Sequence, residues 1–128
     1  NSSFDGVFCT GTLHLFSEAT IKIIFTEIDR ILKPNGMLVL DFATDVRRII
    51  KNRRMKDKTS YKHSYAKRLL RSLAKEYKIK MYESSFADDV AKLPEYGWLS
   101  EGKFVLLVAT KPLNQRVQNQ PFKCLRAN

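Results

Sequence analysis

The sequence predicts an α/β fold with a mostly parallel sheet whose last strand is antiparallel. Three observations lead to this class: an apolar run over residues 4–10, apolar residues at helical spacing over residues 21–32, and a second apolar run over residues 37–43. Strand, helix and strand in this order, with short connections, form a βαβ unit with a right-handed crossover. Nearly unbroken apolar runs are typical of strands covered on both faces, so we expect helices on both faces of the sheet.

The first helix has signals at both ends. Ser17 is a suitable N-cap, and Glu18 lies in the first turn, where a negative charge interacts favourably with the helix dipole. Pro34 ends the helix because it lacks a backbone N–H and disfavours helical geometry in the residue before it. Asn35 and Gly36 then supply the turn into the second strand.

The second half of the sequence continues this architecture. Apolar residues four apart between residues 65 and 77, with basic residues on the other side, predict a second amphipathic helix. Residues 79–86 are a weaker strand candidate, and residues 103–110 are a strong one that ends before Pro112. We therefore expect one domain over residues 1–112 and a polar tail over residues 113–128 that is either poorly ordered or bound by a partner.

Composition excludes several classes of protein. With 44% hydrophobic residues among 128, the chain can bury a core, and its 2 Cys are too few for a disulfide framework. No apolar stretch reaches the roughly 20 residues of a membrane-spanning helix, and the first residues lack the pattern of a secretory signal. We expect a soluble, cytoplasmic protein.

The basic residues are concentrated in one segment. Residues 46–71 contain 11 basic residues and 1 acidic residue, whereas the two kinds balance elsewhere, so this segment carries the whole net charge of +10. Such a segment predicts either a surface that contacts an anionic partner or a solvated loop and helix face.

Common motifs for nucleotides and metals are not matched in full. Residues 97–103 match the first seven positions of a phosphate-binding P-loop, but Phe104 stands where a Ser or Thr would bind magnesium, and a strand is expected to follow. The glycines form no dinucleotide-binding pattern, and His14 and His63 have no spacing for a metal site. His14 follows the carboxyl end of the first strand, where open α/β sheets bind ligands, so a role in a site and a packing role both stay open.

Two segments together carry a family resemblance. Residues 4–14 begin with Phe-Asp-Gly-Val and end with Leu-His, and residues 28–40 run from a helix end through Leu-Lys-Pro-Asn-Gly into a strand. In order and spacing they resemble the later half of the class I S-adenosylmethionine-dependent methyltransferase family, with Asn35 in place of a glycine that is usual there. The later elements agree in order as far as Lys111-Pro112, so the resemblance spans residues 4–112.

The resemblance implies a site at the end of the first strand. Cys9, Thr10 and Gly11 would lie along the methionine part of S-adenosylmethionine and contact it mainly through backbone atoms. Leu13, also a cofactor contact, and His14 would lie where cofactor and acceptor meet. If the acceptor must lose a proton, His14 is the local side chain with a suitable pKa to act as the catalytic base.

In the family, a strand, a glycine-rich cofactor loop and a ribose-binding acidic residue come before these elements. The sequence begins after all three, so we expect that an upstream segment or a partner chain completes the sheet, or that the chain is a remnant that no longer methylates.

The function that the resemblance implies is methyl transfer from S-adenosylmethionine. We expect a small-molecule acceptor, which the basic segment would favour if it is anionic. The alternatives are an RNA methyltransferase that uses residues 46–71, and a non-catalytic binding subunit with the same fold.

Overall fold

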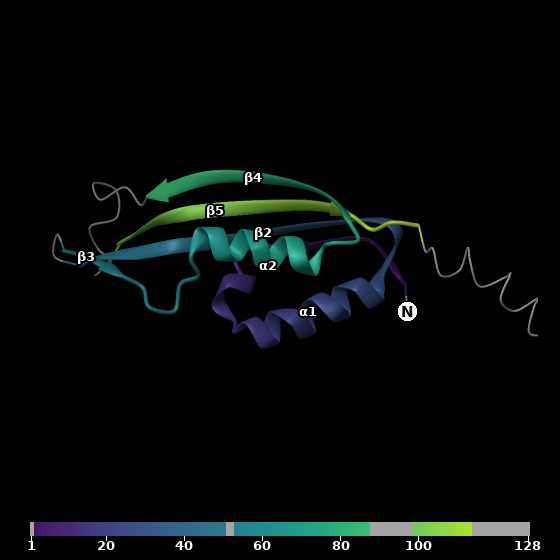
Figure 1. Ribbon diagram of the computed structural model, residues 1–128, viewed down its shortest axis with the longest axis horizontal. Helices are drawn as coiled ribbons and strands as arrows, with labels where there is room; N and C mark the ends of the chain where they lie inside the picture. Colours follow the sequence, from purple (N-terminus) through teal and green to yellow (C-terminus); the bar gives the residue numbers. More distant parts are fainter. Residues whose placement is uncertain (1, 51–52, 88–98, 114–128) are drawn as a thin grey trace, which may run out of the picture.

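The computed structural model describes residues 2–50, 53–87 and 99–113, which form an α/β structure (Figure 1). The elements in chain order are β1 (Phe4–Cys9), a short 3₁₀ helix (Leu13–Leu15), α1 (Glu18–Ile31), β2 (Leu32–Ile50), β3 (Arg53–Lys56), α2 (His63–Leu73), β4 (Lys78–Ala87) and β5 (Leu99–Thr110). No helix among these residues is long and apolar enough to cross a membrane. The predicted tail over residues 113–128 lies outside the described residues, apart from Leu113.

The sheet is mixed. Its strands lie in the order β1-β2-β5-β4, and β3 pairs with β2 at the far end of that long strand. β1 pairs with β2 in parallel, whereas β5 lies between β2 and β4 and runs antiparallel to both. The predicted antiparallel last strand is therefore confirmed. β1, β2 and β4 run in the same direction, but β5 lies between β2 and β4. Among the described strands, β1 and β2 therefore form the one parallel pair.

Both α-helices pack on the same face of the sheet, so the expectation of helices on both faces is wrong for the described residues (Figure 1). The buried core contains alternate residues of β2 and β5, which pair across the ladder and therefore share a face. Residues of α1 and α2 join the same cluster. The opposite face includes the exposed side chains of Phe8, Met37 and Tyr82. An apolar run predicts a strand with two apolar faces, but it does not show whether helices of the same chain cover both of them.

α1 begins as predicted and ends earlier. The Ser17 hydroxyl accepts a hydrogen bond from the backbone N–H of Thr20 at 3.3 Å, which satisfies one free donor of the helix N-terminus. The helix ends at Ile31, and the expected turn is an irregularity within β2, where Asn35 has φ of 65°.

β2 is longer than the predicted strand over residues 37–43, because it continues through the start of the basic segment. Arg47 and Arg48 pair with β3 on one side and with β5 on the other. A β-bulge between Thr44 and Arg47, where Asp45 has φ of 49°, changes the direction of this end of the strand. The basic segment therefore contains the end of β2, the strand β3 and most of α2, and only part of it is a loop.

Candidate functional site

The carboxyl end of β1 lies beside the middle of the long strand β2. Val7 pairs with Leu38 and Cys9 with Leu40 in parallel register, so the loop after β1 lies beside the middle of β2. The backbone N–H of Gly11 donates a hydrogen bond to Asp41 Oδ1 at 2.7 Å, which ties this loop to β2. Gly11 has φ of 63°, a backbone conformation that favours glycine.

The space around Gly11 is open. A Cβ atom added there would have no heavy atom within 4 Å, apart from its chain neighbours. Thr10 is exposed beside it, and the Thr10 carbonyl accepts a hydrogen bond from the Thr12 hydroxyl at 2.8 Å. Backbone at this strand end is therefore accessible to a bound molecule, as the prediction for Thr10 and Gly11 requires.

Cys9 and Leu13 lie on the core side of this edge. Leu13 is 1% exposed and belongs to the hydrophobic core, so its side chain is committed to packing. The Cys9 side chain packs against the same core, and burial, with the nearby Asp41 carboxylate, raises the pKa of its thiol. Cys9 is therefore a neutral thiol at pH 7. Contacts from these two residues to a cofactor would come from their backbone atoms.

His14 is half-buried next to the same carboxylate. Its ring packs edge-to-face on Phe42 with centroids 6.1 Å apart, and its Nδ1 atom is buried without a hydrogen-bond partner among the described residues. Burial lowers the pKa of His14, and the negative charge of Asp41 opposes this effect. The ring is therefore neutral at pH 7, as a proton acceptor must be.

Asp41 was not among the residues that the sequence singled out. It faces the loop that holds Gly11, and its charge acts on the pKa values of both Cys9 and His14. The available signal was its position as the charged residue that interrupts the apolar run over residues 37–43. A carboxylate inside such a run needs a partner, because burying part of a charge is costly.

These residues fit one end of S-adenosylmethionine. The methionine part of that cofactor carries a cationic ammonium group, for which the Asp41 carboxylate and the carbonyl groups at the end of β1 are suitable acceptors. The open space at Gly11 allows a close approach to the backbone. The unpartnered Nδ1 atom of His14 marks the same edge as incomplete.

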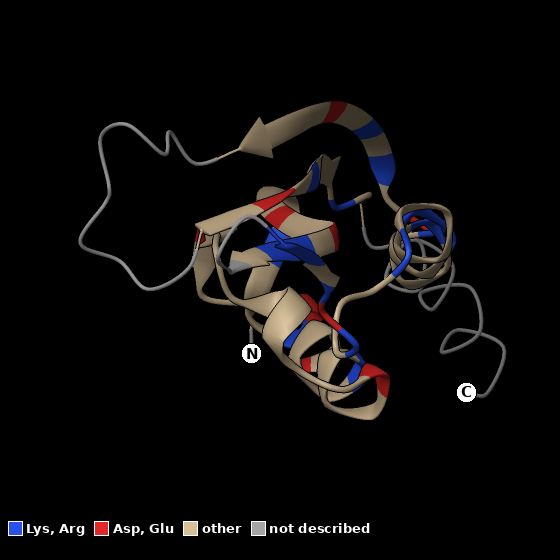
Figure 2. Ribbon diagram, turned by 90° about the vertical axis from the view of Figure 1, so that its left-hand side faces the viewer, with Lys and Arg blue, Asp and Glu red and all other residues tan. Residues whose placement is uncertain are grey.

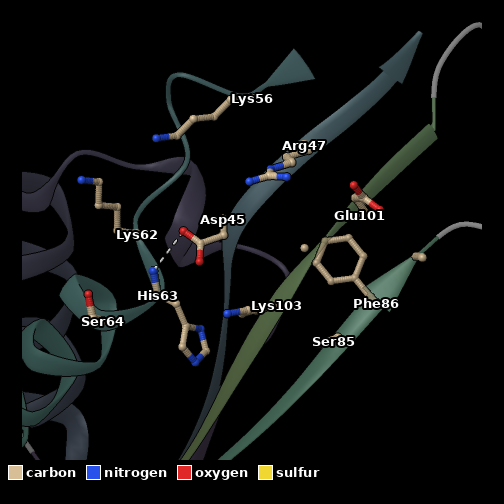
Figure 3. A pocket seen from close by; sticks show the side chains of 12 residues that line it. Asp45, Arg47, Lys56, Lys62, His63, Ser64, Ser85, Phe86, Glu101 and Lys103 are labelled. Atoms are coloured by element: carbon tan, nitrogen blue, oxygen red, sulfur yellow. Dashed lines mark hydrogen bonds between the residues drawn. The ribbon is translucent and has the colours of Figure 1, made fainter. Parts of the chain in front are cut away.

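A second feature lies further along β2, where a cavity of about 910 Å³ opens at the start of α2 (Figure 3). β2 contributes Asp45 and Arg47, α2 contributes His63 and Ser64, and β4 and β5 form the opposite wall. The basic segment lies over this region, and α2, seen nearly end-on at the right of Figure 2, carries several of its Lys and Arg residues.

A buried network fixes His63 at the wall of this cavity. The Thr44 hydroxyl, which has no solvent exposure, lies 2.7 Å from His63 Nδ1, and His63 Nε2 lies 2.5 Å from Glu83 Oε1. Lys67 forms an ion pair with the same Glu83 oxygen at 3.2 Å. Hydrogen bonds from His63 and Lys67 lower the pKa of Glu83. Since both ring nitrogens of His63 are engaged, this histidine positions β2, α2 and β4 relative to one another.

Comparisons with known proteins agree with the predicted family. A family model described as a methyltransferase domain matches residues 1–40, which include β1, the Gly11 loop and α1. No curated protein matches the sequence. A structure from work on the conversion of a disulfide bond into a thioacetal group during echinomycin biosynthesis shares the fold, with a TM-score of 0.61 and 15% identity over 99% of this chain and 56% of that chain.

Two further solved structures are more distant. The 1,6-didemethyltoxoflavin-N1-methyltransferase of Burkholderia thailandensis, with bound S-adenosylhomocysteine, gives a TM-score of 0.49 and 17% identity over 87% of this chain and 45% of that one. The precorrin-6y C5,15-methyltransferase of Geobacter metallireducens gives a TM-score of 0.44 and 20% identity over 86% of this chain and 46% of that one. The chain spans about half the length of these proteins. The family-model match over residues 1–40 supports the class I S-adenosylmethionine-dependent methyltransferase family as the family that this chain resembles, and the solved structure with a TM-score of 0.61 shares its fold.

Proposed function

We propose that this chain takes part in methyl transfer from S-adenosylmethionine to a nucleophile, and that the methionine part of the cofactor binds at the carboxyl end of β1, beside the middle of β2. One observation carries the proposal: the parallel pairing of β1 and β2 brings Gly11, Asp41 and His14 to a single edge that is open to a ligand. The family model covers the loop that contains Gly11 and His14.

The chemistry asks little of the protein beyond positioning. When bound, the cofactor supplies an electrophilic methyl group; the acceptor forms a bond to this carbon as the carbon–sulfur bond breaks. The residues of the chain hold the two molecules in line and exclude water, and these effects account for most of the rate enhancement in such displacements. Asp41 orients the loop through its bond to the Gly11 N–H and provides negative charge for the ammonium group.

His14 is the candidate base for acceptors that must lose a proton. Its Nδ1 atom is enclosed, so Nε2 would receive the proton from the acceptor. The lowered pKa of His14 keeps the ring neutral and ready to accept that proton at pH 7. An acceptor that is already nucleophilic would need no base, and His14 would then serve as part of the wall.

The acceptor is proposed to be a small molecule. The cavity of about 910 Å³ at the end of β2 lies within the usual size range of small-molecule sites, roughly 300–1,000 Å³. An RNA acceptor is the second candidate, because all four residues of β3 in the basic segment are exposed.

A charge-neutral substitution tests the cofactor site. Asp41→Asn keeps an oxygen that accepts the Gly11 N–H but removes the negative charge. Asp5→Asn is the matched control, since Asp5 is exposed near the start of β1 and forms an ion pair with the exposed Lys33 at 3.5 Å. Saturation-transfer NMR with S-adenosylhomocysteine measures the dissociation constant even when binding is weak.

We expect binding weaker than about 1 μM, or −8 kcal/mol, because this edge fits only the methionine part of the cofactor. Asp41→Asn should raise the dissociation constant about tenfold, as expected for one lost charge-assisted contact, and Asp5→Asn should leave it unchanged. Equal effects of the two substitutions, or no effect of either, would place the cofactor elsewhere.

A further inference from the structure

We propose that the cavity at the start of α2 binds the anionic group, a phosphate or a carboxylate, of a small organic ligand. The identification of this ligand as the methyl acceptor rests on the proposed function. The proposal that the cavity binds an anion rests only on the charges and the shape of the cavity. The cavity is lined by residues of the basic segment between Arg47 and Ser64 and by the strands β4 and β5 (Figure 3).

Four cationic side chains line the cavity without an ion pair to any described residue. They come from β2, β3, the N-cap of α2 and β5: Arg47, Lys56, Lys62 and Lys103. In Figure 3 the side chains of Arg47 and Lys103 project from neighbouring strands toward the side on which α2 begins. Like charges that converge on one space repel one another, and an anion bound between them relieves this repulsion.

The two acidic residues of the lining are already engaged. Asp45 Oδ1 accepts a hydrogen bond from the backbone N–H of His63 at 3.3 Å, at the N-terminus of α2. Glu101 Oε1 forms an ion pair with Arg54 Nε at 2.9 Å. The four Lys and Arg side chains and the two acids together give the lining a formal charge of +2. The cavity therefore favours an anionic ligand even where the acids remain charged.

One wall of the cavity is aromatic. The Phe86 ring lines the cavity and packs on Phe104 with centroids 4.7 Å apart. Gly102 makes room for this ring, because a Cβ atom there would lie 2.8 Å from a Phe86 ring carbon and 2.9 Å from the Thr44 carbonyl oxygen. A concave site with an apolar wall and a few convergent charges is typical of small-molecule sites, and a nucleic-acid backbone would instead need cations spread along an open face.

The distance between the two sites sets the form of an acceptor. Asp41 and Asp45 are four residues apart on β2, which corresponds to about 13 Å in an extended strand. A ligand whose anionic group lies in the cavity must therefore extend roughly 10–15 Å to present a nucleophile at His14. We infer an elongated acceptor with its charge at the end far from the methylated atom.

The test uses the full chain, without cofactor, and pyrophosphate or glutarate as probes at constant ionic strength. Two-dimensional ¹H–¹⁵N NMR titration follows the backbone amides of Ser64, Gly102 and Lys103. Lys103→Gln removes one charge from the cavity. Lys80→Gln is the matched control, because Lys80 is an exposed lysine on β4 whose partner in the ladder, Val108, lies on the face away from the helices.

We expect at least one probe to shift these three amides, and Lys103→Gln to raise its dissociation constant about fivefold while Lys80→Gln leaves it unchanged. Preference for pyrophosphate or for glutarate identifies the anionic group. Equal effects of the two substitutions would overturn the proposal, since they would show only general attraction to a basic protein.

A single-stranded RNA of twelve nucleotides provides the third arm. If it binds more tightly than either probe and perturbs β3 and the exposed face of α2 rather than the cavity, the proposal is wrong and the basic segment is a nucleic-acid surface. Since S-adenosylhomocysteine is absent from these titrations, their failure leaves the cofactor site at Gly11 and Asp41 untouched, and failure at that site leaves the anion result standing.

Discussion

Gly11 should respond to substitution through its backbone conformation alone. Its φ of 63° lies in the left-handed region, where an L-amino acid costs about 1–2 kcal/mol, and an added Cβ would meet no heavy atom within 4 Å. Alanine also reduces the entropy of the unfolded chain, which offsets roughly 0.5 kcal/mol. Gly11→Ala should therefore lower the free energy of unfolding by about 1 kcal/mol, and Gly11→Asn by less, because asparagine tolerates this region.

Urea denaturation followed by far-UV circular dichroism measures these differences, provided that the slope with urea is unchanged. Gly6→Ala is the matched control on the same strand, because Gly6 has no positive φ and its Cβ would lie at an ordinary 3.6 Å from the Met37 carbonyl oxygen. It should leave stability unchanged or raise it slightly. An equal loss in both alanine variants, or a Gly11→Ala protein as stable as the parent, would refute this account of the loop.

Substitution at the same position also separates folding from binding. Gly11→Val should leave the domain folded and raise the dissociation constant for S-adenosylhomocysteine, because its side chain would enter the open space that we assign to the cofactor. An unchanged constant in the folded variant would move the cofactor away from this loop.

The remaining predictions concern β2 and the basic segment. Thr44→Val should lower the free energy of unfolding by about 1–3 kcal/mol by leaving His63 Nδ1 without its partner, and a cycle with His63→Leu should show non-additive losses in urea denaturation; additive losses would contradict the hydrogen bond. Hydrogen bonds from Thr59, with Arg48 nearby, lower the pKa of Asp57, so its contribution is present above about pH 4 and is lost as the pH falls through the folded-state pKa. The stability difference from Asp57→Asn should thus be constant between pH 5 and 8 and shrink in acid; a difference that grows in acid would reverse the sign. If RNA binds, replacing four arginines with glutamine should flatten the slope of log affinity against log salt concentration by about 1.4. Four contacts would give about three units, but two of the four arginines already form ion pairs within the protein. An unchanged slope would remove this surface from the RNA hypothesis. The four are Arg47, Arg48, Arg53 and Arg54.

Local signals in the sequence predicted the elements but not how they pack. Ser17 as a cap and the apolar run around Leu40 were sufficient to place α1 and the centre of β2, because capping and burial are local properties. The placement of both helices on one face, and of β5 between β2 and β4, depends on pairing between segments far apart in the sequence. The extension of β2 to Arg47 was missed because exposed basic residues resemble a loop, and only the partner strands show otherwise.

The candidate site was predicted in part for the same reason. Gly11 and His14 follow a recognisable strand end, so the sequence could place them at the ligand-binding edge. Asp41 reaches Gly11 only through the parallel register of β1 and β2, a contact between residues 30 apart. The cavity was not predicted, because its lining comes from five elements that the fold brings together.

The most direct test of the cofactor site is an ¹H–¹⁵N NMR map of the full chain as S-adenosylhomocysteine is added to millimolar concentration. We expect the largest shift changes at the backbone amides of Thr10, Gly11 and His14, with little change at Ser64 and Lys103 in the cavity. Changes centred on the cavity, or none at the end of β1 when the ligand saturates the protein, would contradict the assignment of this edge to the cofactor.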